Sequence, residues 1–184
     1  MLRSFSKILP RIGFAAQRPS DYVGSGPDFF LPQQLDGDLI SEGLIYGPTG
    51  RVVSRFVADM RGDWTGPTAR LTEDFTFASG TTQHRAWALQ LKENGAFTAT
   101  APDIIGQAHG QIEGATARMT YRLRLSEDAG GHVLNVVDWM YLLDNGTILN
   151  RSQMRKFGIK VAELVATIRP AQPVAYHATA LAGQ

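Results

Sequence analysis

VLNVVDWMYLLDNGTILNRSQMRKFG (133–158) is the stretch on which the fold prediction rests. Two apolar runs flank Asn145-Gly146, a dipeptide that readily adopts the two left-handed conformations of a type I′ turn. The stretch is therefore predicted to form a β-hairpin. With Asn145 and Gly146 as the turn, the predicted pairs are Asp144 with Thr147, Leu142 with Leu149, Met140 with Arg151, and Asp138 with Gln153.

In this register a carboxylate and a guanidinium lie on an otherwise apolar face of the hairpin. Asp138 and Arg151 are diagonal neighbours among Met140, Leu142 and Leu149. Charges on an apolar face need pairing or water, because desolvating an ion costs several kcal/mol. This face is predicted to point inward. The opposite face is an apolar alternative, made by Val137, Trp139, Tyr141 and Met154.

Composition limits the class of protein. The chain has 184 residues, enough for one domain, and a net charge of +1 without a clustered basic run, which gives no indication of nucleic-acid binding. It has no cysteine, so disulfides, thiol catalysis and cysteine-ligated metals are excluded. No stretch approaches the roughly 20 apolar residues of a membrane-spanning helix. Frequent glycines between short alternating runs indicate an all-β domain.

Other hairpins extend the pattern toward the N-terminus. Pairing Phe77 with Thr81 around a three-residue loop places Glu73 opposite Arg85. The next turn allows two registers, and the buried pattern favours a three-residue loop at 93–95, which brings Asp103 opposite Arg85. That register sets Phe97, Ala99 and Ala101 against Leu91, Leu89 and Trp87.

The remaining runs complete a meander of about ten antiparallel strands. Strands are predicted at 37–46, 51–61, 104–112, 117–125 and 160–168, with a connection at 62–67 and with Glu42 opposite Arg55. Such a meander without a long helix predicts one closed or nearly closed up-and-down barrel. Small inward residues of the 104–112 strand, such as Gly110, are expected to leave volume for a ligand.

The chain is divided into a leader (1–28), a single barrel domain (29–170) and a C-terminal tail (171–184). Residues 1–20 carry Arg3, Lys7 and Arg11 opposite an apolar stripe and contain no acid. Two interpretations stay open: an amphipathic segment on an anionic membrane, or a disordered or loosely docked leader. A secretory signal is not indicated, because Lys7, Pro10 and Arg11 interrupt any apolar core.

Several motifs resemble an uncharacterised bacterial family, catalogued as a domain of unknown function. The resemblance runs from about Phe29 to Ile168 and rests on LTEDF (71–75), Arg85 with Trp87, Asp103 with Gly106, DWMY (138–141), NR (150–151), Met154 and FG (157–158). It implies a lipocalin-like barrel and an association with enzymes that modify membrane fatty acids, such as cyclopropane synthases. Many members resemble lipoproteins anchored through a cysteine, which this chain lacks. No catalytic residue is transferred.

The inward charges define the candidate site. Glu73, Arg85 and Asp103 form one row across neighbouring strands, and Asp138 with Arg151 forms a second group. The predicted ligand-binding residues are Glu73, Arg85, Trp87, Asp103, Asp138, Met140 and Arg151. One interpretation is a structural ion network inside the barrel. In the other, a surplus acid orients or protonates a ligand, or an arginine holds a fatty-acid carboxylate, with its tail along Phe56, Phe75, Trp87, Met119 and Met140.

Two large aromatic side chains fall on the face opposite to Met140. Trp139 and Tyr141 are expected either to pack beneath the leader or the tail, or to form an exposed patch for a membrane or a partner. The four histidines, His84, His109, His132 and His177, lack metal-ligand spacing. Neither a metal nor another cofactor is predicted.

These observations predict a non-enzymatic protein that binds a fatty-acyl or other hydrophobic small molecule, linked to membrane-lipid metabolism. An alternative is a small lipid-modifying enzyme of the isomerase or cyclase type, with Glu73 or Asp103 as acid/base. A third is an accessory partner of a lipid-modifying enzyme, docking through Trp139, Tyr141 and the leader. The expected location is cytoplasmic, with peripheral inner-membrane contact through residues 1–20 as the open alternative, and no nucleic-acid partner is expected.

Overall fold

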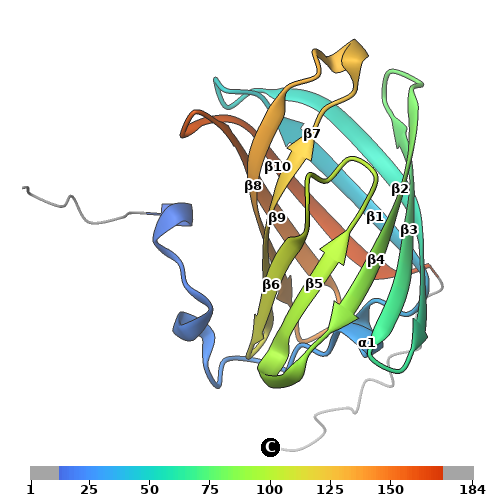
Figure 1. Ribbon diagram of the computed structural model, residues 1–184, viewed down its shortest axis with the longest axis vertical. Coiled ribbons are helices and arrows are strands. Elements are labelled where there is room, and N and C mark those ends of the chain that lie inside the picture. Colours follow the sequence, from blue (N-terminus) through green and yellow to red (C-terminus); the bar gives the residue numbers. More distant parts are fainter. Residues whose placement is uncertain (1–12, 172–184) are drawn as a thin grey trace, which may run out of the picture.

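The computed structural model describes residues 13–171, and these form a closed antiparallel β-barrel (Figure 1). Each strand pairs with the next along the chain, and β10 closes the barrel against β1. The strands are β1 (Gly37–Tyr46), β2 (Val52–Thr65), β3 (Thr68–Phe77), β4 (Thr82–Leu91), β5 (Ala96–Thr100), β6 (Ala108–Glu113), β7 (Thr116–Arg124), β8 (Val133–Leu142), β9 (Ile148–Lys156) and β10 (Ile159–Pro170). The prediction of an all-β up-and-down barrel is confirmed.

The helical elements of the described residues are short. They are η1 (Gly13–Ala16), η2 (Pro19–Tyr22), α1 (Leu31–Gln34), η3 (Glu93–Gly95) and η4 (Glu127–Ala129). None of the helices in residues 13–171 combines the length and apolarity needed to cross a bilayer. Because these helices are short, loops and turns make up most of the two ends of the barrel.

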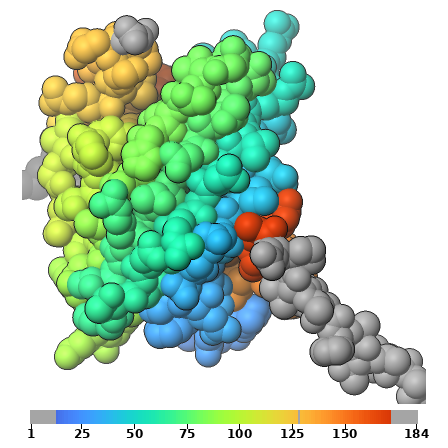
Figure 2. Space-filling model, turned by 90° about the vertical axis from the view of Figure 1, so that its right-hand side faces the viewer, coloured from blue at the N-terminus to red at the C-terminus, as the bar shows by residue number. Residues whose placement is uncertain are grey.

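The lower end in Figure 1 is closed by α1 and the residues around it. Phe29, Leu31 and Leu35 are almost fully buried there, and Figure 2 shows the blue N-terminal residues filling the bottom of the molecule. The indole Nε1 of Trp64 donates to the Leu35 carbonyl oxygen at 3.0 Å. Gly62 allows this contact, since a Cβ at that position would lie 1.8 Å from the same oxygen.

This geometry corrects the predicted connection at 62–67. Gly62 and Trp64 belong to β2, which runs four residues past the predicted strand end at Arg61. The extra length carries both residues to the closed end, where they hold α1. Glycine and tryptophan were interpreted as turn residues, but the strand continues because its backbone still pairs with β3 as far as Thr65–Thr68.

The segment before α1 packs on the outside of β8. The Tyr22 ring lies 5.5 Å from Trp139 and 5.9 Å from Tyr141, measured between centroids. The Tyr141 hydroxyl donates to Gln17 Oε1 at 2.7 Å, and Trp139 is fully buried. The expectation that Trp139 and Tyr141 pack beneath the leader is therefore confirmed for residues 13–28. Residues 1–12, which carry the predicted apolar stripe and the bases opposite it, lie outside the described residues. The tail from residue 172 lies outside them as well.

Two predicted registers on the other side of the barrel are confirmed. Glu73 is directly opposite Arg85 in the β3–β4 pair. Ala99 is opposite Leu89, as the three-residue loop at η3 requires. Both hairpins have one apolar and one polar face, so a shift by one residue would place apolar side chains in water.

The register of the β8–β9 hairpin was predicted wrongly by one residue. Asp138 is opposite Ser152 and Met140 is opposite Asn150. The Leu143 N–H donates to the Thr147 carbonyl at 2.9 Å, so the loop has three residues rather than two. Consequently Leu149 and Arg151 turn to the outer face. The apolar pattern could not fix the register, because residues 13–28 bury the outer face of β8 as well.

The β1–β2 hairpin also differs from its predicted pairing. Its register shifts between Ile45 and Tyr46, so Glu42 lies opposite Val57 and not Arg55. Glu42 pairs instead with Arg169 of β10, at 3.2 Å. Tyr46 is opposite Val52, one residue from its predicted partner, and the irregularity adds a second residue to the displacement of all the pairs beyond it.

Candidate functional site

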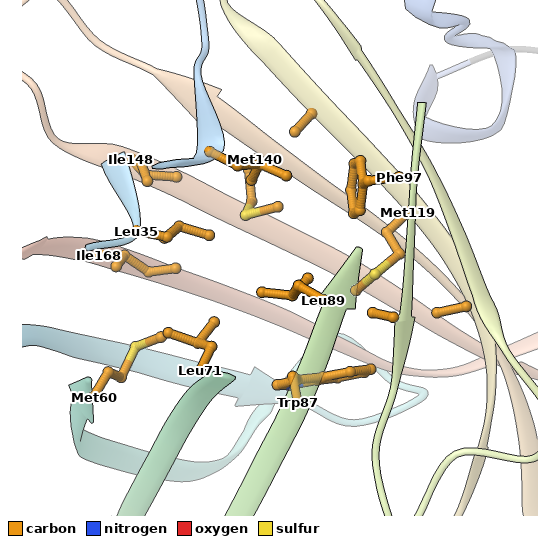
Figure 3. Packing of buried hydrophobic residues seen from close by; sticks show 14 of the residues in the cluster. Leu35, Met60, Leu71, Trp87, Leu89, Phe97, Met119, Met140, Ile148 and Ile168 are labelled. Carbon is orange, nitrogen blue, oxygen red and sulfur yellow. The ribbon is translucent and has the colours of Figure 1, made fainter. Parts of the chain in front are cut away.

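The barrel encloses a cavity of about 970 Å³. It opens between the β3–β4 turn and the loop that contains η4, both at the upper end in Figure 1. Its lower half is apolar, and Figure 3 shows Leu35, Leu89 and Met140 pointing toward the middle of the barrel from three sides. The lining residues thus form a pocket with one mouth and one closed end.

The space for a ligand that was expected beside Gly110 of β6 is occupied. The Phe97 ring lies against Gly110, where a Cβ would come within 2.1 Å of a ring carbon. The prediction that Gly110 leaves space for a ligand is therefore wrong: the glycine makes room for Phe97. The strand is also shorter than predicted, since β6 begins only at Ala108.

A first polar group lies in the wall formed by β3, β4 and the loop after β5. Arg85 donates from Nε and Nη2 to Asp103 Oδ2, at 2.9 and 2.7 Å. Its Nη1 is 3.6 Å from Glu73 Oε2, and the Trp87 indole donates to the same Glu73 oxygen at 3.1 Å. Asp103 Oδ1 is buried and has no hydrogen-bond partner among the described residues. One guanidinium therefore serves two carboxylates and leaves one acceptor open.

A second polar group lies around Asp138 on β8. Ser152 Oγ donates to Asp138 Oδ1 at 2.6 Å, and Asn150 Nδ2 donates to the same oxygen. The Tyr121 hydroxyl lies 3.4 Å from Asp138 Oδ2. The Tyr121 ring also packs edge-on against Trp87, 5.5 Å between centroids. Tyr121 therefore connects the two polar groups into one belt around the middle of the cavity.

Burial dominates the electrostatics of this belt. It raises the pKa of Glu73, although the Arg85 charge and the Trp87 hydrogen bond oppose the rise. Burial also raises the pKa of Asp138 against the hydrogen bonds from Ser152 and Asn150. The pKa of Tyr121 is raised well above its usual range, first by burial and then by the charge of Asp138. These shifts favour protonated, neutral side chains.

The belt has more acid than base. Among the described residues that line the cavity below its mouth, Glu73, Asp103 and Asp138 face a single cation, Arg85. Like charges in a desolvated site cannot all ionise, so the surplus is relieved by protonation or by a ligand that brings donors or positive charge. Chemically, the belt can accept hydrogen bonds, or donate a proton from Glu73 or Asp138.

Six of the predicted ligand-binding residues line this cavity: Glu73, Arg85, Trp87, Asp103, Asp138 and Met140. Arg151 does not, because the corrected register places it outside. Its Nε donates to Glu163 at 2.6 Å, and its guanidinium lies 5.2 Å from the centroid of the Phe14 ring. Burial would raise the pKa of Glu163, but hydrogen bonds from Lys160 and Arg151 outweigh it and the pKa is lowered. Arg151 is thus a structural partner on the outer face.

Sequence reasoning missed three members of the belt: Tyr121, Asn150 and Ser152. Tyr121 lies in the strand predicted at 117–125 but was not among the predicted ligand-binding residues. Asn150 and Ser152 were assigned to the outer face by the register error. A signal for them was present, because a buried carboxylate needs donors and the alternating pair Asn150 and Ser152 supplies them opposite Asp138.

Within residues 13–171, no three His, Asp or Glu side chains lie close enough together to hold a metal ion. His84, for example, is exposed and lies 2.6 Å from Asp74 on the outside of the barrel. Among the described residues, the hydrogen-bond partners of the acids in the belt are Arg85, Trp87, Tyr121, Ser152 and Asn150. The belt is therefore built from hydrogen bonds and one ion-pair cluster.

The closed barrel, the α1 segment that covers its lower end and the cavity that opens at its upper end define a lipocalin-like barrel. The crystal structure of Rv2717c from M. tuberculosis is similar, with a TM-score of 0.53 and 16% identity over 76% of this chain and 94% of that one. The S-type phycobiliprotein lyase CPES from Guillardia theta has the same TM-score of 0.53, with 6% identity over 77% and 91% of the two chains. At these identities the likeness concerns the fold.

The chain belongs to the family described as Protein of unknown function (DUF3833), whose model matches residues 9–170. This confirms the resemblance to an uncharacterised domain family. Among curated proteins, none matches the sequence.

Proposed function

We propose that this protein binds an elongated, mainly apolar small molecule inside the barrel, with a neutral or cationic polar group of the ligand at the belt. The observation that carries the proposal is a cavity of about 970 Å³ with an apolar closed end and a belt rich in acceptors. Small-molecule sites typically enclose about 300–1,000 Å³ and combine apolar walls with a few convergent polar groups. The barrel meets both conditions.

The charge of the belt selects the polar group of the ligand. A ligand carboxylate would meet Glu73, Asp103 and Asp138, while Arg85 already has Nε and Nη2 engaged by Asp103. A hydroxyl, an amide or an amine instead brings hydrogen-bond donors to a cavity wall that holds three carboxyl groups. The sequence suggested that an arginine holds a fatty-acid carboxylate. We propose instead that the ligand has a neutral or cationic head group. The chemistry is that of an alcohol, an amide or an amine on an apolar chain.

A fatty-acyl chain with such a head group fits the apolar lower half, which is lined by side chains such as Leu71, Leu89 and Met140. The link to membrane-lipid metabolism and a place beside the inner membrane are further parts of this proposal, and they rest on the family resemblance alone. Neither is needed for the binding chemistry. The binding proposal stands on the cavity and its charges.

One specific observation favours a second candidate, an acid/base enzyme. Glu73 and Asp138 face the same cavity with raised pKa values, which is how enzymes keep a carboxylic acid protonated near neutral pH. In that case Glu73→Gln removes the proton donor while retaining an acceptor for the Trp87 indole. Binding of a ligand would persist in Glu73→Gln, and conversion of that ligand would stop. A binding protein would show retention without conversion in both forms.

The proposal is tested by native mass spectrometry of the full chain purified from its own host. We expect a bound small molecule that organic extraction releases and that carries no carboxylate. The matched variant is Leu89→Trp, which places an indole in the cavity and should cost about 1–3 kcal/mol of stability, the usual range for an enlarged buried side chain. It should emerge empty. Protein without any bound molecule, or a Leu89→Trp variant equally loaded, would remove the proposal.

A further inference from the structure

The turn between β9 and β10 exposes two large apolar side chains. Phe157 is 91% exposed and Ile159 is 69% exposed. Phe157 and Gly158 both have positive φ, 52° and 83°, as a two-residue hairpin turn of this kind requires. Asparagine and glycine adopt this conformation with little strain, whereas phenylalanine rarely does. Phe157 is thus unfavourable for both the backbone and the solvent, which makes it a candidate contact residue.

Basic side chains flank this turn. The sequence RKFGIK (155–160) contains three bases and no acid, and because Lys160 pairs with Glu163 at 2.7 Å, Arg155 and Lys156 supply the excess positive charge. Lys156 Nζ lies 5.6 Å from the centroid of the Phe157 ring, and Arg155 Nη1 donates to the Gly158 carbonyl at 3.0 Å. One base therefore lies beside the exposed ring, and a second is held against the backbone of the same turn. Exposed apolar tips among lysine and arginine are suited to an anionic lipid surface.

The position of the turn agrees with this chemistry. The β9–β10 turn lies at the upper end in Figure 1, together with the turns of β1–β2 and β3–β4 and with the η4 loop. The cavity opens at that same end. Val52 and Val53, beside the β1–β2 turn, are 47% and 65% exposed and extend the apolar rim. A membrane or a partner that covers this end of the barrel would also face the opening of the cavity.

We propose that the rim formed by residues 155–160 and the β1–β2 turn docks on an anionic membrane, with Phe157 and Ile159 inserted among the lipid head groups. The barrel mouth then opens toward the bilayer. This surface is distinct from residues 1–20, which the sequence indicated for membrane contact. The docking rests on the rim alone and stands whether or not the cavity holds a ligand.

The test is flotation of the full chain with vesicles of phosphatidylcholine and phosphatidylglycerol. Phe157→Asn removes the ring and relieves the turn, so thermal stability should not fall, while the vesicle-bound fraction should drop by about tenfold. Leu143→Asn is the matched control, since Leu143 is a 38% exposed apolar residue at the β8–β9 turn of the opposite end. It should float like the natural protein. Phe157→Trp should shift its emission to shorter wavelength when vesicles are added.

Natural protein that does not float, or a Phe157→Asn variant that floats equally, overturns the proposal. If Phe157→Asn instead turns a dimer into a monomer in gel filtration, with flotation unchanged, a second copy covers the rim and the lipid proposal is likewise overturned. Native mass spectrometry of Phe157→Asn separates the two proposals. A retained cavity ligand with lost flotation supports docking. An empty cavity in both the natural protein and Phe157→Asn, with flotation lost only in the variant, counts against ligand binding and leaves docking standing.

Discussion

Arg85 donates from two nitrogens to a single oxygen of Asp103, at 2.9 and 2.7 Å, and leaves the other oxygen of that carboxylate buried without a partner. The third nitrogen of the guanidinium, Nη1, lies 3.6 Å from Glu73 Oε2. Glu73, Asp103 and Asp138 thus share one cation on the cavity wall, which makes the belt an acceptor for a ligand's donors and a poor site for a ligand's negative charge.

Removing the arginine should leave two buried carboxylates without a counter-charge. We expect Arg85→Met to lower the free energy of unfolding by about 3 kcal/mol at neutral pH. Part of the loss should be recovered on acidification, because Glu73, whose pKa burial raises, then takes up a proton. Urea unfolding at about pH 7 and about pH 5 measures both effects. Arg61→Met, which removes an exposed cation paired with Asp38, should change nothing measurable, and an equal loss in both variants would contradict this account.

The raised pKa values of Glu73 and Asp138 set the direction of the pH dependence. A carboxyl whose pKa is higher in the folded state binds a proton that the unfolded chain has released. Folding stability should therefore increase as the pH falls from about 7 toward the usual carboxyl range. The pKa of Glu163 is lowered, so this group makes folding stability decrease as the pH falls, but only once the pH is below the usual carboxyl range.

The variant Asp138→Asn isolates one of these groups. Its amide oxygen can still accept from Ser152 and Asn150, so the fold should persist while the pH slope of stability becomes smaller. The measurement is the urea midpoint as a function of pH for both proteins. Identical slopes would show that Asp138 is ionised in the folded state.

The closed end depends on the absence of one side chain. Gly62→Ala would place a Cβ 1.8 Å from the Leu35 carbonyl oxygen and displace α1. We expect a loss of about 3 kcal/mol, because Leu31 and Leu35 lose burial and Trp64 loses its acceptor. Gly66→Ala is the control: it has φ of 57° with nothing within 4 Å and should cost only about 1 kcal/mol. Equal costs would mean that α1 is not held through Gly62.

The segment on the outer face can be tested through Trp139. Tyr22→Ala removes the ring that lies 5.5 Å from the Trp139 ring. Stability should fall by about 2 kcal/mol, and tryptophan emission should shift to longer wavelength as water reaches the indole. Val23→Ala truncates a neighbouring side chain that is 67% exposed, and its emission should be unchanged. An unshifted Tyr22→Ala spectrum would contradict the docking of residues 13–28.

The sequence predicted strand register best where one face of a strand is exposed to solvent and the other is buried. Glu73 opposite Arg85 and Ala99 opposite Leu89 follow from such strands, because any shift would expose apolar side chains. β8 is different, since Trp139 on one face and Met140 on the other are both buried. There the Asn145-Gly146 dipeptide decided the register, and it indicated a two-residue loop where the chain forms a three-residue one.

That single shift also limited the prediction of the site. Glu73, Arg85 and Asp103 were placed together from pairing alone, whereas Arg151 was assigned to the cavity and Asn150 and Ser152 were not. The packing of residues 13–28 on β8 is a contact between distant parts of the chain, which no local pattern specifies. The cavity itself depends on side-chain volumes such as Phe97 over Gly110, and these too follow only from the folded structure.

The central claim is tested most directly by calorimetric titration of the purified chain with three matched probes: decylamine, decanol and decanoate. The account predicts that the amine and the alcohol bind once per chain, that the carboxylate binds at least about tenfold more weakly, and that Leu89→Trp abolishes binding of all three. No binding by any probe, tightest binding by decanoate, or binding that Leu89→Trp leaves unchanged would contradict it.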